Sequence, residues 1–179
     1  MLDFPAPRSA VTSDRRLVTL RPITCEDRNA LRAFHQTLSP HTVYLRYFGS
    51  HPRLSEADLD LFTDVDGHRR MAIIALDGQG RIVAVGRYMA PKTGGPTAEL
   101  AFVVTDAWQG VGLYGLLYAE LRAAAEHYGI TEFIADVLST NTRMMRVLTR
   151  DGVPTLRGDD GTYRKIVIPV GKVAASHAA

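Results

Sequence analysis

The sequence has very little cysteine and no long apolar run. Cys25 is the only cysteine among 179 residues, which excludes an internal disulfide and a zinc site built on cysteines. No apolar segment approaches the ~18 residues of a membrane span, and the opening residues MLDFPAPRSAVTSDRR lack the apolar block of a secretory signal. We therefore expect a cytoplasmic protein without a membrane partner.

The chain also lacks a strong excess of charge of either sign. Its formal net charge is +2, and no basic stripe with interleaved aromatic residues occurs, so we expect no nucleic-acid partner. The six histidines are scattered, with no pair at ligand spacing on one helix, so no metal site is predicted. Apolar residues make up 46% and charged residues 22%, as is usual for a globular domain.

Apolar periodicity and turn residues predict one α/β domain over residues 17–170, with a flexible leader (1–16) and a flexible tail (171–179). Helix-start signals occur at Thr24, at Ser39 followed by proline, and at Ser55 with Asp58. A hairpin is predicted around the turn DGQG at 77–80. The predicted strands are 17–23, the two arms of this hairpin, AELAFVV (98–104), 133–138 and 163–170, and further helices follow Gly112 and cover 141–151.

The stretch WQGVGLYG (108–115) supports two interpretations. Its glycines spell G-x-G-x-x-G, which is typical of dinucleotide-binding folds, and Glu132 and Asp136 lie about twenty residues downstream, where such folds place a ribose-binding acid. However, a dinucleotide fold places its glycines directly after its first strand. Here five residues, Thr105 to Gln109, separate the loop from a strand that follows a hairpin.

The second interpretation is a loop that holds the diphosphate of coenzyme A. Gln109 and Gly112 fit most of the pattern Q/R-x-x-G-x-G/A. A glycine-rich turn into a helix leaves backbone N–H groups at the positive end of the helix dipole, where a diphosphate finds both donors and complementary charge. Gly112 would let the backbone approach the phosphates closely.

The stretch AELAFVVTDAWQGVGLYGLLYAEL resembles the acetyl-CoA-binding core of the GCN5-related N-acetyltransferase (GNAT) superfamily, and the resemblance covers roughly residues 17–170. It implies an α/β fold whose mixed, mostly antiparallel sheet is flanked by helices and splays between two parallel strands, the one ending at Val104 and the one at 133–138. It also implies acetyl-CoA as co-substrate. The residues that it implies for cofactor binding are Phe102, Val103, Val104, Gln109, Gly110, Val111, Gly112, Leu113, Tyr114, Gly115 and Asn141.

The resemblance also implies a catalytic base, Glu99, which stands on the strand before the loop. A neutral amine is needed for attack on a thioester, and a free lysine has a pKa near ~10.4, so a base must remove a proton. Strand alternation places Glu99 on one face with Ala101 and Val103. Two positions depart from the family pattern. Tyr114 replaces the usual Gly or Ala, and Leu148 stands where many members have a tyrosine that protonates the leaving thiolate.

The segment LSPHTVYLRYF (38–48) and the string AELAFVVTDAWQG are similar to bacterial protein-lysine acetyltransferases that modify AMP-forming acyl-CoA synthetases. In that group the domain is often fused to regulatory modules, so this chain is expected to be part of a larger multidomain protein. Acetylation of a small amine, and acyl-CoA sensing without catalysis, stay open as alternatives.

Two charged stretches are candidates for recognition. The segment 54–66 carries five carboxylates and no basic residue, which predicts a docking surface for a basic protein or simply a solvated helix face. Arg143, Arg146 and Arg150 follow Asn141 at near-helical spacing, either to reach the ribose phosphate of the cofactor or to face solvent.

Overall fold

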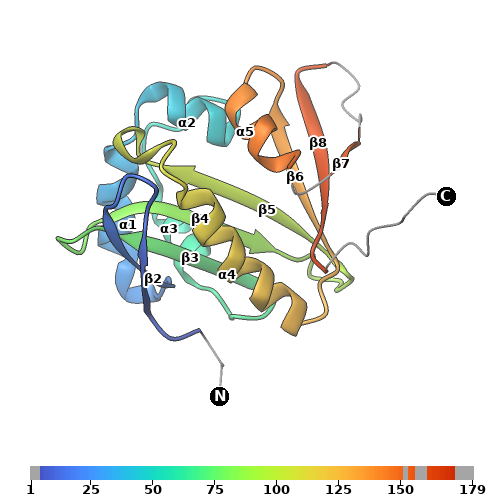
Figure 1. The fold of residues 1–179 in the computed structure, drawn as a ribbon, viewed down its shortest axis with the longest axis horizontal. Coiled ribbons are helices and arrows are strands. Elements are labelled where there is room, and N and C mark those ends of the chain that lie inside the picture. The colour runs from blue at the N-terminus through green and yellow to red at the C-terminus, as the bar shows by residue number, and fades with distance from the viewer. Residues whose placement is uncertain (1–4, 151–152, 156–160, 172–179) are drawn as a thin grey trace.

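Figure 1 shows a twisted sheet covered by helices, in a computed structural model that describes residues 5–150, 153–155 and 161–171. In the described residues the sheet has eight strands, in the order β1-β2-β3-β4-β5-β6-β8-β7. The strands are β1 (Arg8–Val11), β2 (Leu17–Pro22), β3 (Arg70–Leu76), β4 (Ile82–Met89), β5 (Thr97–Val104), β6 (Glu132–Leu138), β7 (Val153–Thr155) and β8 (Tyr163–Pro169). The helices are α1 (Arg28–Gln36), α2 (Pro40–Tyr47), α3 (Glu56–Thr63), α4 (Leu113–His127) and α5 (Thr142–Leu148), with short 3-10 turns η1 (Cys25–Asp27) and η2 (Asp106–Trp108).

The prediction of a flexible leader is wrong for residues 8–11, which form β1 and pair antiparallel with β2. Thr12 closes the turn between these strands, since its backbone N–H donates to the carbonyl of Arg16 at 2.9 Å. The strand is short and mostly exposed. Its sequence therefore shows no clear alternation of apolar and polar residues from which it could be predicted. Residues 1–4 and the predicted tail from 172 onward lie outside the described residues.

The helix-start signals are confirmed at Ser39 and Ser55. The Ser39 hydroxyl accepts a hydrogen bond from Thr42 N, and Ser55 and Asp58 form a reciprocal capping box. At Thr24 the chain first makes η1, and α1 begins only at Arg28. The last helix is shorter than predicted. Asn141 is the N-cap of α5 rather than its first residue, and the helix ends at Leu148.

Two hydrophobic clusters lie on opposite faces of the sheet. One contains Leu117 and Leu121 of α4 and Leu148 of α5, and the other contains Leu31 of α1 and Leu59 of α3. Figure 1 shows α4 crossing the near face of the sheet while α1 and α3 lie behind it. Burial alternates along β5 between these faces, as the sequence predicts.

The parallel pair of strands opens toward the middle of the molecule. β5 and β6 are in register only from Thr97 to Glu99, which pairs with Ile134, so the two strands separate from Leu100 onward. The remaining strand pairs are antiparallel. The expected mixed, splayed sheet is therefore confirmed, whereas a dinucleotide fold would need a parallel βαβ array.

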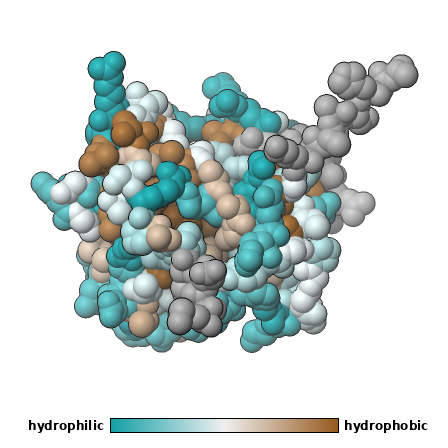
Figure 2. All heavy atoms as spheres, turned by 60° about the horizontal axis from the view of Figure 1, so that its bottom comes forward, coloured by the Kyte–Doolittle hydropathy of each residue, from teal (hydrophilic) through white to brown (hydrophobic). Residues whose placement is uncertain are grey.

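The face in Figure 2 is mostly hydrophilic, with hydrophobic side chains gathered at its upper left. Two large hydrophobic side chains are strongly exposed on the N-terminal strands, Val11 at 59% and Leu17 at 60%. No helix in the described part of the chain is long and apolar enough to cross a membrane.

Candidate active site

The glycine-rich loop leads directly into α4. Gly112 is the N-cap, and its φ of 85° is in the left-handed region that side chains rarely adopt. Because glycine has no side chain, nothing caps the helix at this residue. The N–H groups of Leu113, Tyr114 and Gly115 have no partner within the helix, as in any first turn. This end of α4 therefore offers several donors and the positive end of the helix dipole.

A cavity of about 910 Å³, called the large cavity below, lies over this helix start. Its wall includes Phe102, Val103 and Val104 at the end of β5, and Asn141 at the start of α5. It also includes most of the predicted loop residues, namely Gln109, Gly110, Gly112, Leu113, Tyr114 and Gly115. Val111 is not part of the wall, and its carbonyl instead accepts a hydrogen bond from Ser13 N at 3.0 Å.

The side chain of Gln109 binds three other protein groups. Its Nε2 donates to Thr42 Oγ1 at 3.1 Å and to the Val104 carbonyl at 3.2 Å. Its Oε1 accepts from Arg143 Nη1 at 2.9 Å. Gln109 thus ties the loop to α2, β5 and α5, and the side chain positions the loop.

Asp106 attaches the same segment to the start of α2. Its carboxylate accepts hydrogen bonds from Ser39 N at 3.1 Å, Ser39 Oγ at 2.7 Å and Thr42 Oγ1 at 2.9 Å. Burial alone would raise the pKa of Asp106, but these bonds outweigh it and hold the pKa below its ordinary value. The ionised carboxylate therefore fixes the loop to α2 at neutral pH.

The turn between β1 and β2 supports the loop from the other side. The guanidinium of Arg16 lies 3.7 Å from the centre of the Trp108 ring and donates to the Ala107 carbonyl at 3.3 Å. Together with the bond from Ser13 to Val111, these contacts make the N-terminal strands part of the loop's framework. Sequence reasoning missed this role because these contacts join residues far apart in the chain.

The ring of Tyr114, the first departure from the family pattern, lies along α4. It stacks on Tyr118, one turn further on, at 5.5 Å between ring centres and 9° between planes. It also packs edge-on against Phe102 at 4.7 Å. The ring therefore forms part of the cavity wall and is directed along the helix.

A second cavity of about 290 Å³, called the small cavity below, contains Glu99 in its wall. Leu100 to Phe102 of β5 and Ala135 to Val137 of β6 also line it, so it lies where these strands separate. The two cavities share wall residues, which are Leu45, Arg46, Phe102, Asn141 and Met144. They therefore adjoin at the end of the parallel register.

The side chains that line the small cavity with Glu99 include residues of α2, β6 and α5. Arg46 and Tyr47 belong to α2, and Asp136 lies on β6, two residues beyond the register partner of Glu99. Asp136 lies 4.0 Å from Lys165 of β8. Leu148, the second departure, is 2% exposed and lines the small cavity, so no tyrosine hydroxyl occupies that place.

The arginines of α5 differ in their positions. Arg143 and Arg150 line the large cavity and Arg146 does not. Arg122 of α4, which sequence reasoning did not single out, also lines it and forms an ion pair with Glu126 at 3.1 Å. Together with Arg46 of α2, four guanidinium groups of the described residues therefore border the cavity.

The carboxylates of the acidic segment 54–66 are partly paired within the chain. Each of its five carboxylates has an intramolecular partner: Glu56 pairs with Arg28 and Arg32, Asp60 with Arg28, Asp64 and Asp66 with Arg70, and Asp58 with Ser55 and His51. The surface consequently offers less negative charge to a partner than the sequence suggests, and the docking alternative stays a prediction.

Comparison with protein families and curated proteins identifies related chains. Residues 17–153 match the model of the acetyltransferase (GNAT) domain. Acetyltransferase PA5475 of Pseudomonas aeruginosa is 37% identical over 138 residues, covering 75% of this chain and 73% of that protein. Acetyltransferase Pat of Mycolicibacterium smegmatis is 29% identical over 143 residues, covering 79% of this chain but only 43% of that protein.

Solved structures give the same relationship. The GNAT domain of S. lividans PAT superposes with a TM-score of 0.86 at 30% identity, covering 93% of this chain and 99% of that one. The putative acetyltransferase yncA of Salmonella typhimurium, determined with acetyl-CoA, shares the fold with a TM-score of 0.64 at 18% identity, covering 90% of this chain and 99% of that one.

Proposed function

The chain belongs to the GNAT family of acetyltransferases, and on that premise we propose that it transfers an acetyl group from acetyl-CoA to the Nε atom of a protein lysine. One observation carries the proposal: two cavities adjoin where β5 and β6 separate, and a carboxylate, Glu99, lines the smaller one. The large cavity suits a long, phosphorylated carrier, and the small cavity suits the acceptor.

The large cavity holds the carrier through the start of α4. The N–H groups of Leu113, Tyr114 and Gly115 bind the diphosphate, and Gly110 and Gly112 let the backbone approach it. Arg143 and Arg150 of the same cavity add positive charge. Asn141 caps α5 through its side-chain oxygen Oδ1, which accepts from Met144 N at 3.1 Å, and the residue lines both cavities.

The acetyl group then lies near Phe102, which lines both cavities. β5 is not in register with β6 at Phe102 to Val104. Backbone N–H groups of this segment accordingly bind the carbonyl oxygen as it becomes negative during attack. Glu99 takes the proton of the incoming amine, directly or through water, and the amine attacks the thioester without a covalent enzyme intermediate.

The mouth of the small cavity supports a protein acceptor. Phe48, the C-cap of α2, lines the small cavity and is 42% exposed, and Tyr44 of α2 is 47% exposed. The ring of Phe48 stacks on Tyr163 of β8 at 6.3 Å. An exposed aromatic side chain in the wall of a narrow cavity, with a second one on the neighbouring helix, fits a slender side chain that projects from a protein surface better than an enclosed small amine.

The acceptor proteins that we propose are AMP-forming acyl-CoA synthetases, from the similarity of segment 38–48 to acetyltransferases of that group. The match with Pat covers only 43% of that protein, so regulatory domains beyond this chain are part of the proposal.

The function can be tested by incubating the protein with radiolabelled acetyl-CoA and a panel of purified acyl-CoA synthetases. We expect label on a single lysine of at least one synthetase, located by mass spectrometry. Label transfer only to small amines would favour the small-amine alternative. Binding of acetyl-CoA without transfer to any amine would favour acyl-CoA sensing and contradict the proposal.

A further inference from the structure

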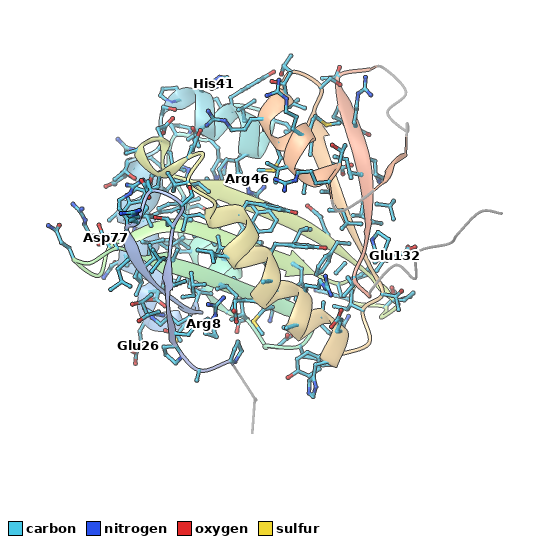
Figure 3. All side chains as sticks on the ribbon, viewed as in Figure 1. Arg8, Glu26, His41, Arg46, Asp77 and Glu132 are labelled. Carbon is cyan, nitrogen blue, oxygen red and sulfur yellow. The ribbon has the colours of Figure 1, made fainter. Side chains whose placement is uncertain are left out.

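Arg46 of α2 lies at the junction of the two cavities. It lines both of them, and Figure 3 labels it between α2 and the sheet. Its neighbours that also line both cavities are Leu45, Phe102, Asn141 and Met144, which carry no charge. Among the described residues, Arg46 is thus the charged residue that lines both the cavity proposed for the carrier and the cavity proposed for the acceptor.

The guanidinium of Arg46 has no counter-ion in contact. Within the described part of the chain, no carboxylate lies within 4.0 Å of it, and no hydrogen bond from it occurs. Its aromatic contact is the ring of Tyr47, 5.1 Å away. Burial lowers the pKa of Arg46, and only Tyr47 and Glu99 act in the opposite sense. Burying an unpaired guanidinium costs free energy of folding. A negatively charged ligand or intermediate beside it would offset this cost.

The charged groups around Arg46 can be named element by element. Tyr47 shares α2, Arg87 comes from β4, Glu99 from β5 and Asp136 from β6. Arg87 is a like charge whose guanidinium packs on the ring of Phe62 at 4.3 Å. Neither carboxylate neutralises Arg46 by direct contact, and Glu99 is needed as the base.

We propose that Arg46 is a catalytic residue that stabilises the thiolate of coenzyme A as it leaves. This inference rests on the proposed function and deepens it. It also explains how the thiolate can leave although Leu148 stands where many family members have a tyrosine acid. A fixed cation stabilises an anion without transferring a proton.

The step balances without any further reactant. Glu99 first passes one proton of the lysine ammonium to solvent water. The lone pair of the neutral nitrogen then forms the new C–N bond, and Glu99 takes a second proton from that nitrogen. The C–S bond then breaks, and its electron pair stays on sulfur beside Arg46, which keeps its own proton. The thiolate finally regains a proton from protonated Glu99 through water, which restores the enzyme and releases coenzyme A.

The direct test is a titration of the thiol of bound coenzyme A, followed by the ultraviolet absorbance of the thiolate, with free coenzyme A alongside. An opposite charge within about 4–6 Å lowers a pKa by about 1–3 units. We expect such a lowering for wild type and its loss in Arg46→Gln. Arg46→Lys, which keeps a cation, should retain part of it.

His41→Gln is the matched control, since His41 is exposed on the same helix and lines neither cavity. It should titrate like wild type. In the acetylation assay, Arg46→Gln should lower kcat about 100-fold, while its affinity for coenzyme A changes little. This split between kcat and affinity would not follow from general misfolding, which circular dichroism checks.

Two results would overturn the inference. If bound coenzyme A titrates like the free thiol in wild type, or identically in wild type and Arg46→Gln, Arg46 has no such role, while the lysine-acetylation proposal stands, since no acceptor is used. If coenzyme A does not bind at all, both proposals fail together.

Discussion

Glu99→Gln should reduce kcat for lysine acetylation by about 10²–10⁴-fold, the usual contribution of a general base. The substitution preserves the shape of the side chain but removes its ability to take a proton. Glu99 lines the small cavity and not the large one, so the affinity for acetyl-CoA should stay nearly unchanged. Steady-state kinetics with a protein acceptor and a separate acetyl-CoA binding isotherm measure the two quantities.

The pH dependence makes this prediction sharper. A free lysine has a pKa near ~10.4, so raising the pH supplies the neutral amine without a base. The deficit of Glu99→Gln should therefore shrink steadily as pH rises. Glu132→Gln is the matched control, because Glu132 is exposed at the start of β6 and lines neither cavity. An unchanged kcat in Glu99→Gln would remove this residue from the mechanism.

Gly112→Val should weaken acetyl-CoA binding by about 10–100-fold, which corresponds to losing one hydrogen bond to a charged group. Gly112 lines the large cavity, and a Cβ there would meet no protein atom within 4 Å, so we expect a larger side chain to take up space that the diphosphate needs. The left-handed backbone at this residue, with φ of 85°, would also be strained by a β-branched side chain. Isothermal titration calorimetry measures the loss.

Gly80→Val is the control that separates the effect of backbone strain from the effect of blocking the cofactor site. Gly80 lies in the β3–β4 hairpin with φ of 75°, and a Cβ there also meets nothing within 4 Å. Both variants should lose similar thermal stability, but only Gly112→Val should lose acetyl-CoA affinity. Equal affinities in the two variants would contradict a diphosphate site at the start of α4.

Local signals in the sequence predicted most of the fold. The caps at Ser39 and Ser55, the hairpin and the alternation along β5 depend on neighbouring residues, so they can be recognised without tertiary structure. The strand β1 was missed because it is short, and its place in the sheet depends on pairing with β2. The 3-10 turn before α1 was missed because Thr24 and Asp27 form the same box at either kind of helix start.

In the candidate site, too, local motifs could be predicted from the sequence, and positions that depend on tertiary packing could not. The loop residues could be predicted because a glycine-rich helix start is a contiguous motif. Arg46 could not, since its position between two cavities results from the packing of α2 against β5. The ion pairs of the acidic segment could not be predicted for a related reason, because its arginine partners on α1 are distant in sequence.

The most direct test is a crystal structure with a bisubstrate analogue, in which a peptide lysine Nε is joined to the sulfur of coenzyme A through an acetyl bridge. It would show where the diphosphate and the lysine nitrogen bind. We expect the diphosphate within hydrogen-bond distance of the backbone N–H groups at residues 110–115, and the lysine nitrogen in the small cavity beside Glu99. A diphosphate bound away from the start of α4, or a lysine entering from another side, would contradict the mechanism described above.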